Sequence, residues 1–225
     1  MISGLIRKEM LLEFRQKSAL GGVVVYVAGT IFITSLCFLG RVLEVNTWNT
    51  LFWIISLFTS VTINGRSFLK ETGGAGLYNY LHYSPQKFIL AKVLYNMIFM
   101  LALSLVTFCF YAFFMKIQRL PNQEPGVGNM PLFLIVLTLA STGLAGVLSL
   151  MSAIAAKANG NFAMMSILSF PVIMPMILVI IRLSKQAVDG IEWAGVSFSL
   201  MAVLLALNVI TVLLSFLLFP YLWRD

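Results

Sequence analysis

The sequence predicts an all-α integral membrane protein with six transmembrane helices. The chain has 225 residues, of which 60% are hydrophobic and 10% are charged, whereas about a quarter of an ordinary soluble domain is charged. Six apolar runs follow one another, separated by short charged stretches. A run of about 20 residues is long enough to cross a hydrocarbon core of about 30 Å as a helix. We therefore expect residues 1–225 to form one membrane domain.

The hydropathy pattern sets the limits of the six predicted spans, which are Leu20–Leu39, Thr47–Asn64, Phe88–Phe114, Pro131–Ala155, Phe162–Ile181 and Val196–Phe219. Of the 15 lysine and arginine residues, ten lie on the side of the N-terminus and five on the other side. Because positively charged loops are retained in the cytoplasm, we expect both termini to be cytoplasmic. Aromatic residues of the interfacial type fall near the predicted membrane boundaries, namely Trp48, Trp193, Tyr221 and Trp223.

Charge and cysteine content exclude some classes of protein. The net charge of +7 is spread over membrane-flanking segments and forms no basic stripe, so nucleic acid is not an expected partner. The only cysteines, Cys37 and Cys109, lie inside apolar runs and are interpreted as small core residues. A disulfide between them is the weaker alternative, because both residues are predicted to lie towards the same membrane face.

Residues 1–18 are predicted to form an interfacial helix, because apolar side chains recur at helical spacing from Ile2 to Phe14. Two carboxylates, Glu9 and Glu13, interrupt the apolar arc of this helix. Because a helix lying only on lipid would not place acids there, we favour contact with protein. A solvated face is the alternative.

The connection over residues 65–87 is the least membrane-like part of the chain and is predicted to be a cytoplasmic coupling loop. It carries Arg66 and Glu71 and then a glycine-rich hinge, made of Gly73, Gly74 and Gly76. A Leu77–Leu81 pair, one helical turn apart, can present a short amphipathic helix to a partner. Ordinary interfacial charge is the alternative interpretation of Arg66 and Glu71.

Ser84 and Pro85 predict where the third long helix starts, because serine is a good N-cap and proline suits the first helical position. A helix from Pro85 to Phe114 is about 45 Å long. That exceeds the bilayer core, so its first turns, with Lys92 near the membrane boundary, should protrude or bend.

The fifth span contains Pro171 and Pro175, four residues apart. Each proline removes a backbone donor, so the helix should bend or break at membrane depth, either for packing or as a conformational hinge. Asn96 and Asn208 should bond to neighbouring helices, and Gly143 and Gly146 should allow close helix approach.

No enzyme constellation is visible. The spans lack ionisable residues away from their ends, the single histidine is His82 in the loop, and no G-x-x-x-x-G-K-[ST] motif is present. The chain is therefore not expected to be an enzyme or to hold a metal or cofactor itself. The methionines of the fifth span are interpreted as apolar filler rather than haem ligands.

Three segments together resemble the CcmB family, the haem exporter permease subunit of cytochrome c maturation. The first is the loop pattern Arg66, Glu71, glycine break, Leu77, Leu81, Pro85 and Leu90-Ala91-Lys92-Val93. The others are Ser166-Ile167-Leu168-x-x-Pro171-x-x-x-Pro175 and the N-terminal Arg7-Lys8-Glu9 followed by Glu13-Phe14-Arg15-Gln16-Lys17. The similarity covers essentially the whole chain.

This resemblance implies a type-2 ABC permease fold in the bacterial inner membrane. It implies docking of a separate CcmA-like ATPase on the N-terminal helix and the loop, so that ATP is bound by the partner and haem is cargo of the complex. The coupling residues would be Glu9, Glu13, Arg66, Glu71, Leu77, Leu81, Pro85 and Lys92. CcmC-like and CcmD-like membrane subunits, a CcmE-like haem chaperone, a second copy of the chain and membrane lipid are the other expected partners.

Two other functions fit the same residues. One is a permease of this fold that moves a lipid or another small molecule. The other is a scaffold that holds haem-handling partners without transport.

Overall fold

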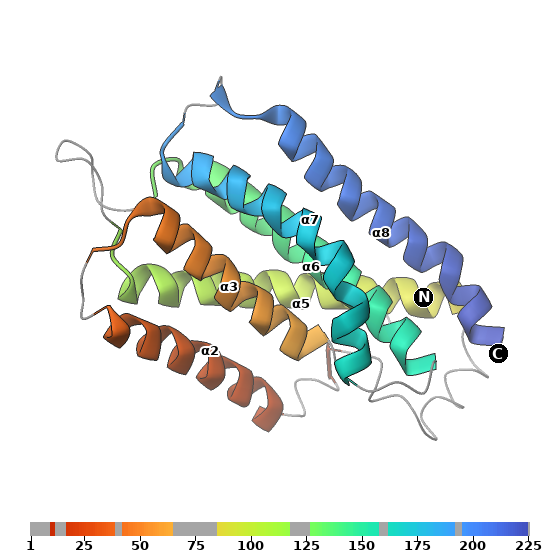
Figure 1. The fold of residues 1–225 in the computed structure, drawn as a ribbon. Helices are drawn as coiled ribbons and strands as arrows, with labels where there is room; N and C mark the ends of the chain where they lie inside the picture. The colour runs from red at the N-terminus through yellow and green to blue at the C-terminus, as the bar shows by residue number, and fades with distance from the viewer. Residues whose placement is uncertain are drawn as a thin grey trace.

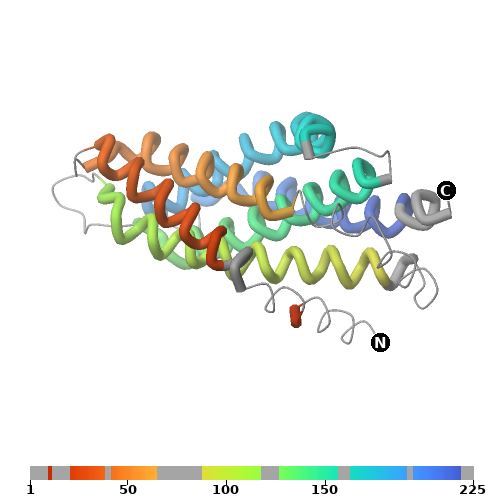
Figure 2. The backbone as a smooth tube through the Cα atoms, turned by 90° about the horizontal axis from the view of Figure 1, so that it is seen from below, coloured from red at the N-terminus to blue at the C-terminus, as the bar shows by residue number. Residues whose placement is uncertain are grey.

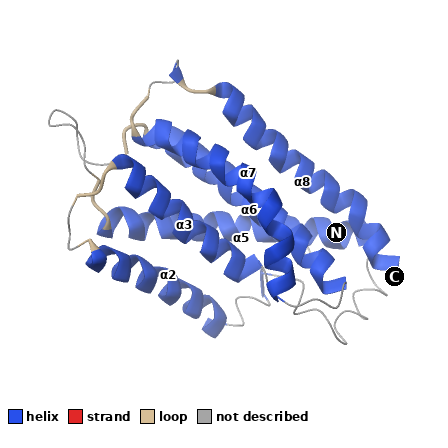
Figure 3. Ribbon diagram, in the orientation of Figure 1, coloured by secondary structure: helices blue, strands red, loops and turns tan. Residues whose placement is uncertain are grey.

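The computed structural model is built from long helices packed as one bundle (Figure 1). They are α2 (Lys17–Cys37), α3 (Val45–Asn64), α5 (Pro85–Phe114), α6 (Met130–Lys157), α7 (Phe162–Val188) and α8 (Phe198–Arg224). The structure describes residues 10–11, 17–38, 42–64, 85–117, 127–157, 162–191 and 195–224. Within these ranges no strand is present, and the residues outside the helices are loops and turns (Figure 3).

The helices alternate in direction, which defines the two ends of the bundle. We call the end where α2, α5 and α7 begin the basal end, and the end where α3, α6 and α8 begin the distal end. The tube view shows the long helices packed side by side between these two ends (Figure 2). Positive-inside reasoning predicts that the basal end is cytoplasmic.

Helix α6 lies at the centre of the bundle and packs against α5, α7, α8 and α3. Its most apolar stretch is 72% buried, whereas that of α8 is only 17% buried. Small residues on α6 allow this central position, because they leave room for the side chains of its neighbours. The outer helices keep large apolar side chains exposed, as expected of surfaces that face lipid or other membrane subunits.

In the part of the chain that the structure describes, four helices are long and apolar enough to cross a membrane, namely Phe88–Phe114, Met130–Ala156, Ala163–Val188 and Phe198–Leu218. Gly21–Cys37 is a shorter apolar helix, and α3 is rich in amide and hydroxyl side chains. The chain is therefore a membrane protein, and six complete crossings remain a prediction.

The predicted helix limits are close to the observed ones, with one informative difference. Helix α5 spans the predicted Pro85–Phe114. Helix α7 continues to Val188, seven residues beyond the predicted end at Ile181. Hydropathy missed this last part because Arg182, Lys185 and Gln186 are polar, although they continue the helix.

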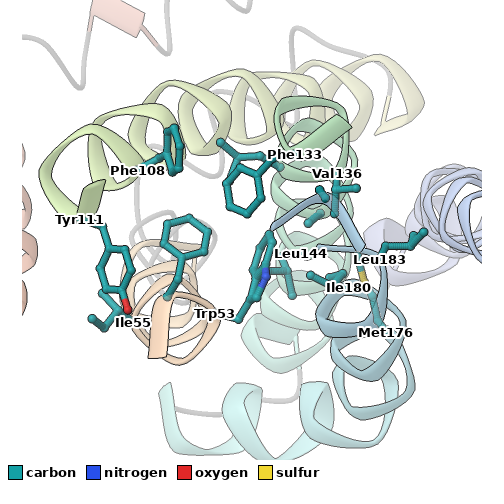
Figure 4. Packing of buried hydrophobic residues seen from close by; sticks show 14 of the residues in the cluster. Trp53, Ile55, Phe108, Tyr111, Phe133, Val136, Leu144, Met176, Ile180 and Leu183 are labelled. Carbon is teal, nitrogen blue, oxygen red and sulfur yellow. The ribbon is translucent and has the colours of Figure 1, made fainter. Parts of the chain in front are cut away.

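Aromatic rings fill the distal half of the core (Figure 4). Phe52 of α3 contacts the rings of Trp48, Trp53, Phe108, Tyr111 and Phe133 with centroids 5.1 to 6.1 Å apart. Each such pair contributes about 1 kcal/mol beyond the area that it buries. The distal half is therefore tightly packed.

Backbone contacts close the distal end over these rings. Leu43 and Ile117 form an isolated parallel bridge, and the Leu43 N–H donates to the Lys116 carbonyl at 3.0 Å. The indole N–H of Trp48 donates to the Met115 carbonyl at 2.9 Å, and the Tyr111 hydroxyl donates to the Trp48 carbonyl at 2.8 Å. These bonds fix the start of α3 to the end of α5.

Two interpretations of single residues were wrong. Trp48 is not an interfacial anchor, because it is 2% exposed and is bonded inside the core. Cys37 and Cys109 are not core residues, because both are exposed free thiols. The sequence pattern misled in both cases, since a residue near a helix end or inside an apolar run can point either inwards or outwards.

Candidate functional site

The basal end of α5 places a cation inside the protein. Lys92 lies two turns from Pro85 and is only 4% exposed. Its Nζ lies 5.7 Å from the ring centroid of Phe88, within the range of a cation–π contact. Phe88, Ile89 and Val93 pack with Ala153 of α6 in a small apolar cluster. Lys92 was predicted as a coupling residue near the membrane boundary, and the structure places its side chain in the contact between α5 and its neighbours.

A buried amide fastens α5 to α6 one turn further along. The Nδ2 of Asn96 donates to the Ser149 hydroxyl at 2.8 Å, and both residues are buried. The predicted bonding of this intramembrane amide to a neighbouring helix is confirmed. Helix α5 is therefore bonded to α6 here and to α3 at its distal end, and it is continuous between the two bonds.

The centre of α6 is shaped for close packing. A Cβ added at Gly143 would meet the Met176 methyl and would lie 2.9 Å from Nδ2 of Asn208. Nδ2 of Asn208 donates to the carbonyl of Leu139 at 3.0 Å, and its Oδ1 accepts from the Thr142 hydroxyl at 3.2 Å. The predictions for Asn208 and for Gly143 are therefore confirmed.

Gly146 provides the second such position on α6. A Cβ there would lie 3.0 Å from the Met97 methyl and 3.2 Å from the Thr211 hydroxyl. Helix α8 therefore approaches α6 at both glycines, which lie one turn apart, while α7 lies beside Gly143 and α5 lies beside Gly146. Methionine methyl groups fill the space beside both glycines, as expected of apolar filler.

Helix α7 stays helical through both prolines, so the structure shows a bend and no break. Pro171 and Pro175 lie inside α7, and the ribbon changes direction along this helix in Figure 1. Both prolines are on its exposed side. The two bonds that they remove are those to the carbonyls of Ile167 and Pro171, so α7 has fewer backbone hydrogen bonds here than an uninterrupted helix.

The other predicted coupling and hinge residues lie outside the described residues. They are Glu9, Glu13, Arg66, Glu71, Gly73, Gly74, Gly76, Leu77 and Leu81. Pro85 is described as the first residue of α5, without its side-chain contacts. Of the predicted site, the structure therefore places Pro85, Lys92, Pro171 and Pro175.

Sequence reasoning missed the polar face of α3. Asn49, Trp53, Ser56, Ser60 and Asn64 follow one another at spacings of four, three, four and four residues, and all are buried. That spacing is the signature of one helix face, and it could have been found. An apolar-run search overlooks it because it averages the hydropathy over all faces.

Within the described ranges, no group of three or more His, Cys, Asp or Glu side chains could hold a metal ion. One end of the bundle is tightly packed, α5 is one continuous helix of 30 residues, and α7 bends where it contains two prolines.

Comparison with known protein families identifies the family of this chain. The family model described as CcmB protein matches residues 1–221. The chain belongs to the CcmB family. A comparison with curated proteins gave no match. CcmB proteins are transporter permeases and not enzymes, and the family identifies the chain as a membrane component of the haem exporter in cytochrome c maturation, within the Ccm system.

Proposed function

We propose that this CcmB protein is the permease subunit of an ABC complex that acts in haem delivery for c-type cytochrome biogenesis. A separate CcmA-like ATPase supplies the energy and binds ATP. The chain has a type-2 permease fold in the bacterial inner membrane, and its basal end faces the cytoplasm. Haem is cargo of the complex, and this chain alone holds no cofactor.

The observation that carries this proposal is the construction of α5. It is one helix of 30 residues, about 45 Å long, and buried hydrogen bonds hold it at Asn96, about three turns from its start, and at Tyr111, near its distal end. Its first residue, Pro85, directly follows the 65–84 segment that carries the CcmB-like loop pattern. A displacement of that loop would therefore be transmitted to α5, which extends as one helix to the distal end.

The two segments proposed to receive the ATPase are the N-terminal helix, with Glu9 and Glu13, and the loop from Arg66 to Leu81. Pro85 and Lys92, in the first turns of α5, are the residues to which the loop transmits the movement of the ATPase. The glycines at 73, 74 and 76 give the loop freedom to follow the ATPase, and the bend of α7 lets the basal half of the bundle move.

The other members of the complex are proposed to be CcmC-like and CcmD-like membrane subunits and a CcmE-like haem chaperone. A second copy of the chain is proposed as a further partner, with lipid around the assembly. The exposed apolar side chains of α2, α7 and α8 leave large surfaces for such contacts.

Replacing Arg66 or Glu71 by alanine tests the proposal. Each substitution removes one charge from the proposed docking loop, so ATP hydrolysis by the complex and the yield of cytochrome c should both fall by about tenfold, as for a lost charge contact of about 1.4 kcal/mol. Insertion and protein level should be unchanged. Lys116→Ala, at the distal end, is the control. Normal cytochrome c in the Arg66 and Glu71 variants would contradict the proposal.

Two rivals are separated by other measurements. A permease for a lipid or another small molecule would be encoded apart from cytochrome maturation genes and would not change haem delivery. A scaffold without transport would bind the same subunits, but the native complex in nanodiscs would show no ATP-dependent change at its distal loops.

A further inference from the structure

Among the described residues, the hydrogen bonds identified between α3 and α7 lie at the distal end of their contact. Asn49 Nδ2 donates to the Ile181 carbonyl at 3.0 Å, and the indole N–H of Trp53 donates to the Ser184 hydroxyl at 2.7 Å. Further towards the basal end, the polar side chains of α3 bond to their own helix. Ser60 donates to the Ser56 carbonyl at 2.7 Å, and Asn64 donates to the Ser60 carbonyl at 3.2 Å.

Two buried polar atoms on this face of α3 have no hydrogen-bond partner within the described part of the chain. They are the Oδ1 of Asn49 and the hydroxyl of Ser56. Asn49 is 1% exposed and Ser56 is 7% exposed. Buried polar groups are normally bonded, and each exception calls for an explanation. The unbonded Ser56 hydroxyl in the core is explained if α3 and α7 have a second arrangement in which this hydroxyl forms a hydrogen bond.

Helix α7, on the other side of this contact, is able to pack against α3 in a second way. Helices α3 and α7 are antiparallel, and Asn49 lies level with Ile181. Ser56 is seven residues further along α3, about 10 Å towards the basal end, so it lies level with the region of Met174. That region follows directly on Pro171, where α7 has lost its regular hydrogen bonds.

We propose that the contact between α3 and α7 has two packed states. In both states the distal half of α7 stays fastened through Asn49 and Trp53. In the second state the basal half of α7, residues 162–174, is displaced against α3 about the two prolines, and the Ser56 hydroxyl gains a hydrogen bond across the contact. Packed cores move between discrete arrangements of this kind. Ser56 is therefore a positioning residue that stabilises the second state.

Distances between spin labels in the native complex test the proposal. The basal pair replaces Phe58 and Phe170, which are exposed on α3 and α7, and the distal pair replaces Thr50 and Leu178, which are also exposed. We expect two distances for the basal pair and one for the distal pair. A single basal distance under all conditions, or equal movement of both pairs, would overturn the proposal.

Ser56→Ala supplies the second readout. Because a net hydrogen bond shifts an equilibrium by about two- to tenfold, the population of the second state should fall by about that factor. The thermal stability of the first state should not fall, since the lost hydroxyl is unbonded there. Ser60→Ala is the matched control on the same face, because its hydroxyl already has a partner. Unchanged populations in Ser56→Ala would contradict the assignment of Ser56.

These outcomes are separate from those of the proposed function. Absence of any effect of ATP on the two populations would count against coupling to an ATPase, whereas the effect of Ser56→Ala on the populations is measured without nucleotide.

Discussion

Single residues decide how closely the helices of this CcmB protein pack. The clearest case is Gly143 on α6, where the hydrogen atom in place of a side chain makes room for Met176 of α7 and Asn208 of α8. Met176 is flexible and can withdraw. Asn208 is held by bonds to the carbonyls of Leu139 and Leu204, so it cannot move without losing them. Any side chain at position 143 therefore disturbs a network.

We expect Gly143→Ala to destabilise the protein by about 1–3 kcal/mol, the usual cost of overpacking a close-packed core. Thermal unfolding of the purified protein measures this. Gly29→Ala on α2 is the control, because a Cβ there meets nothing within 4 Å. Alanine favours a helix by about 0.5–1 kcal/mol over glycine, so the control should be as stable as the natural protein or more so. Equal stability of the two variants would show that α6 is less tightly packed than described.

At the residue scale, the sequence predicted contacts correctly where a side chain has only one chemically acceptable environment. An amide in an apolar span has to find a partner, and Asn96 and Asn208 both did. It failed where direction matters. The sequence gives no orientation for Trp48, Cys37 or Cys109, because whether a side chain faces the core depends on the neighbouring helices.

At the scale of elements, α5 and α7 have contrasting properties. Helix α5 contains no internal proline and is bonded to α6 and α3, so it should move as one rod. Helix α7 carries Pro171 and Pro175 and bends. The start of α5 at Pro85 and the presence of a bend in α7 were predictable, because proline acts through its own backbone. The continuity of α7 through both prolines was not predictable, because its other backbone hydrogen bonds depend on packing against neighbouring helices.

Restoring the backbone donors of α7 should impair function without impairing stability. In the double variant Pro171→Ala and Pro175→Ala, two helical hydrogen bonds become available, so α7 should stiffen. We expect lower cytochrome c yield at a normal protein level, with thermal stability equal to or above that of the natural chain. Cytochrome c spectra and protein level in membranes measure the two effects.

The control for the prolines is Met174→Leu, which lies between them and changes volume little. It should leave the cytochrome c yield unchanged. If the double proline variant also gave a normal yield, the bend would serve packing alone, as the alternative interpretation of the sequence holds.

At the scale of the whole molecule, the bundle is tightly packed at its distal end and carries its buried lysine at its basal end. The aromatic cluster around Phe52 and the bonds of Trp48 close one end, and Lys92 lies near the other. Composition predicted the all-α membrane class, and the motifs predicted the family that the comparison shows. The aromatic cluster was not predictable, because its six rings come from helices far apart in the sequence.

Coupling to a cytoplasmic ATPase requires that the loop between α3 and α5 faces the cytoplasm. A single cysteine at Asn79, in a chain whose exposed Cys37 and Cys109 are replaced by serine, can be labelled with a membrane-impermeant maleimide. We predict labelling in inside-out vesicles and none in right-side-out vesicles, because a cytoplasmic ATPase has to reach this loop. Labelling from the outer side alone would contradict the proposed coupling of this permease to an ATPase.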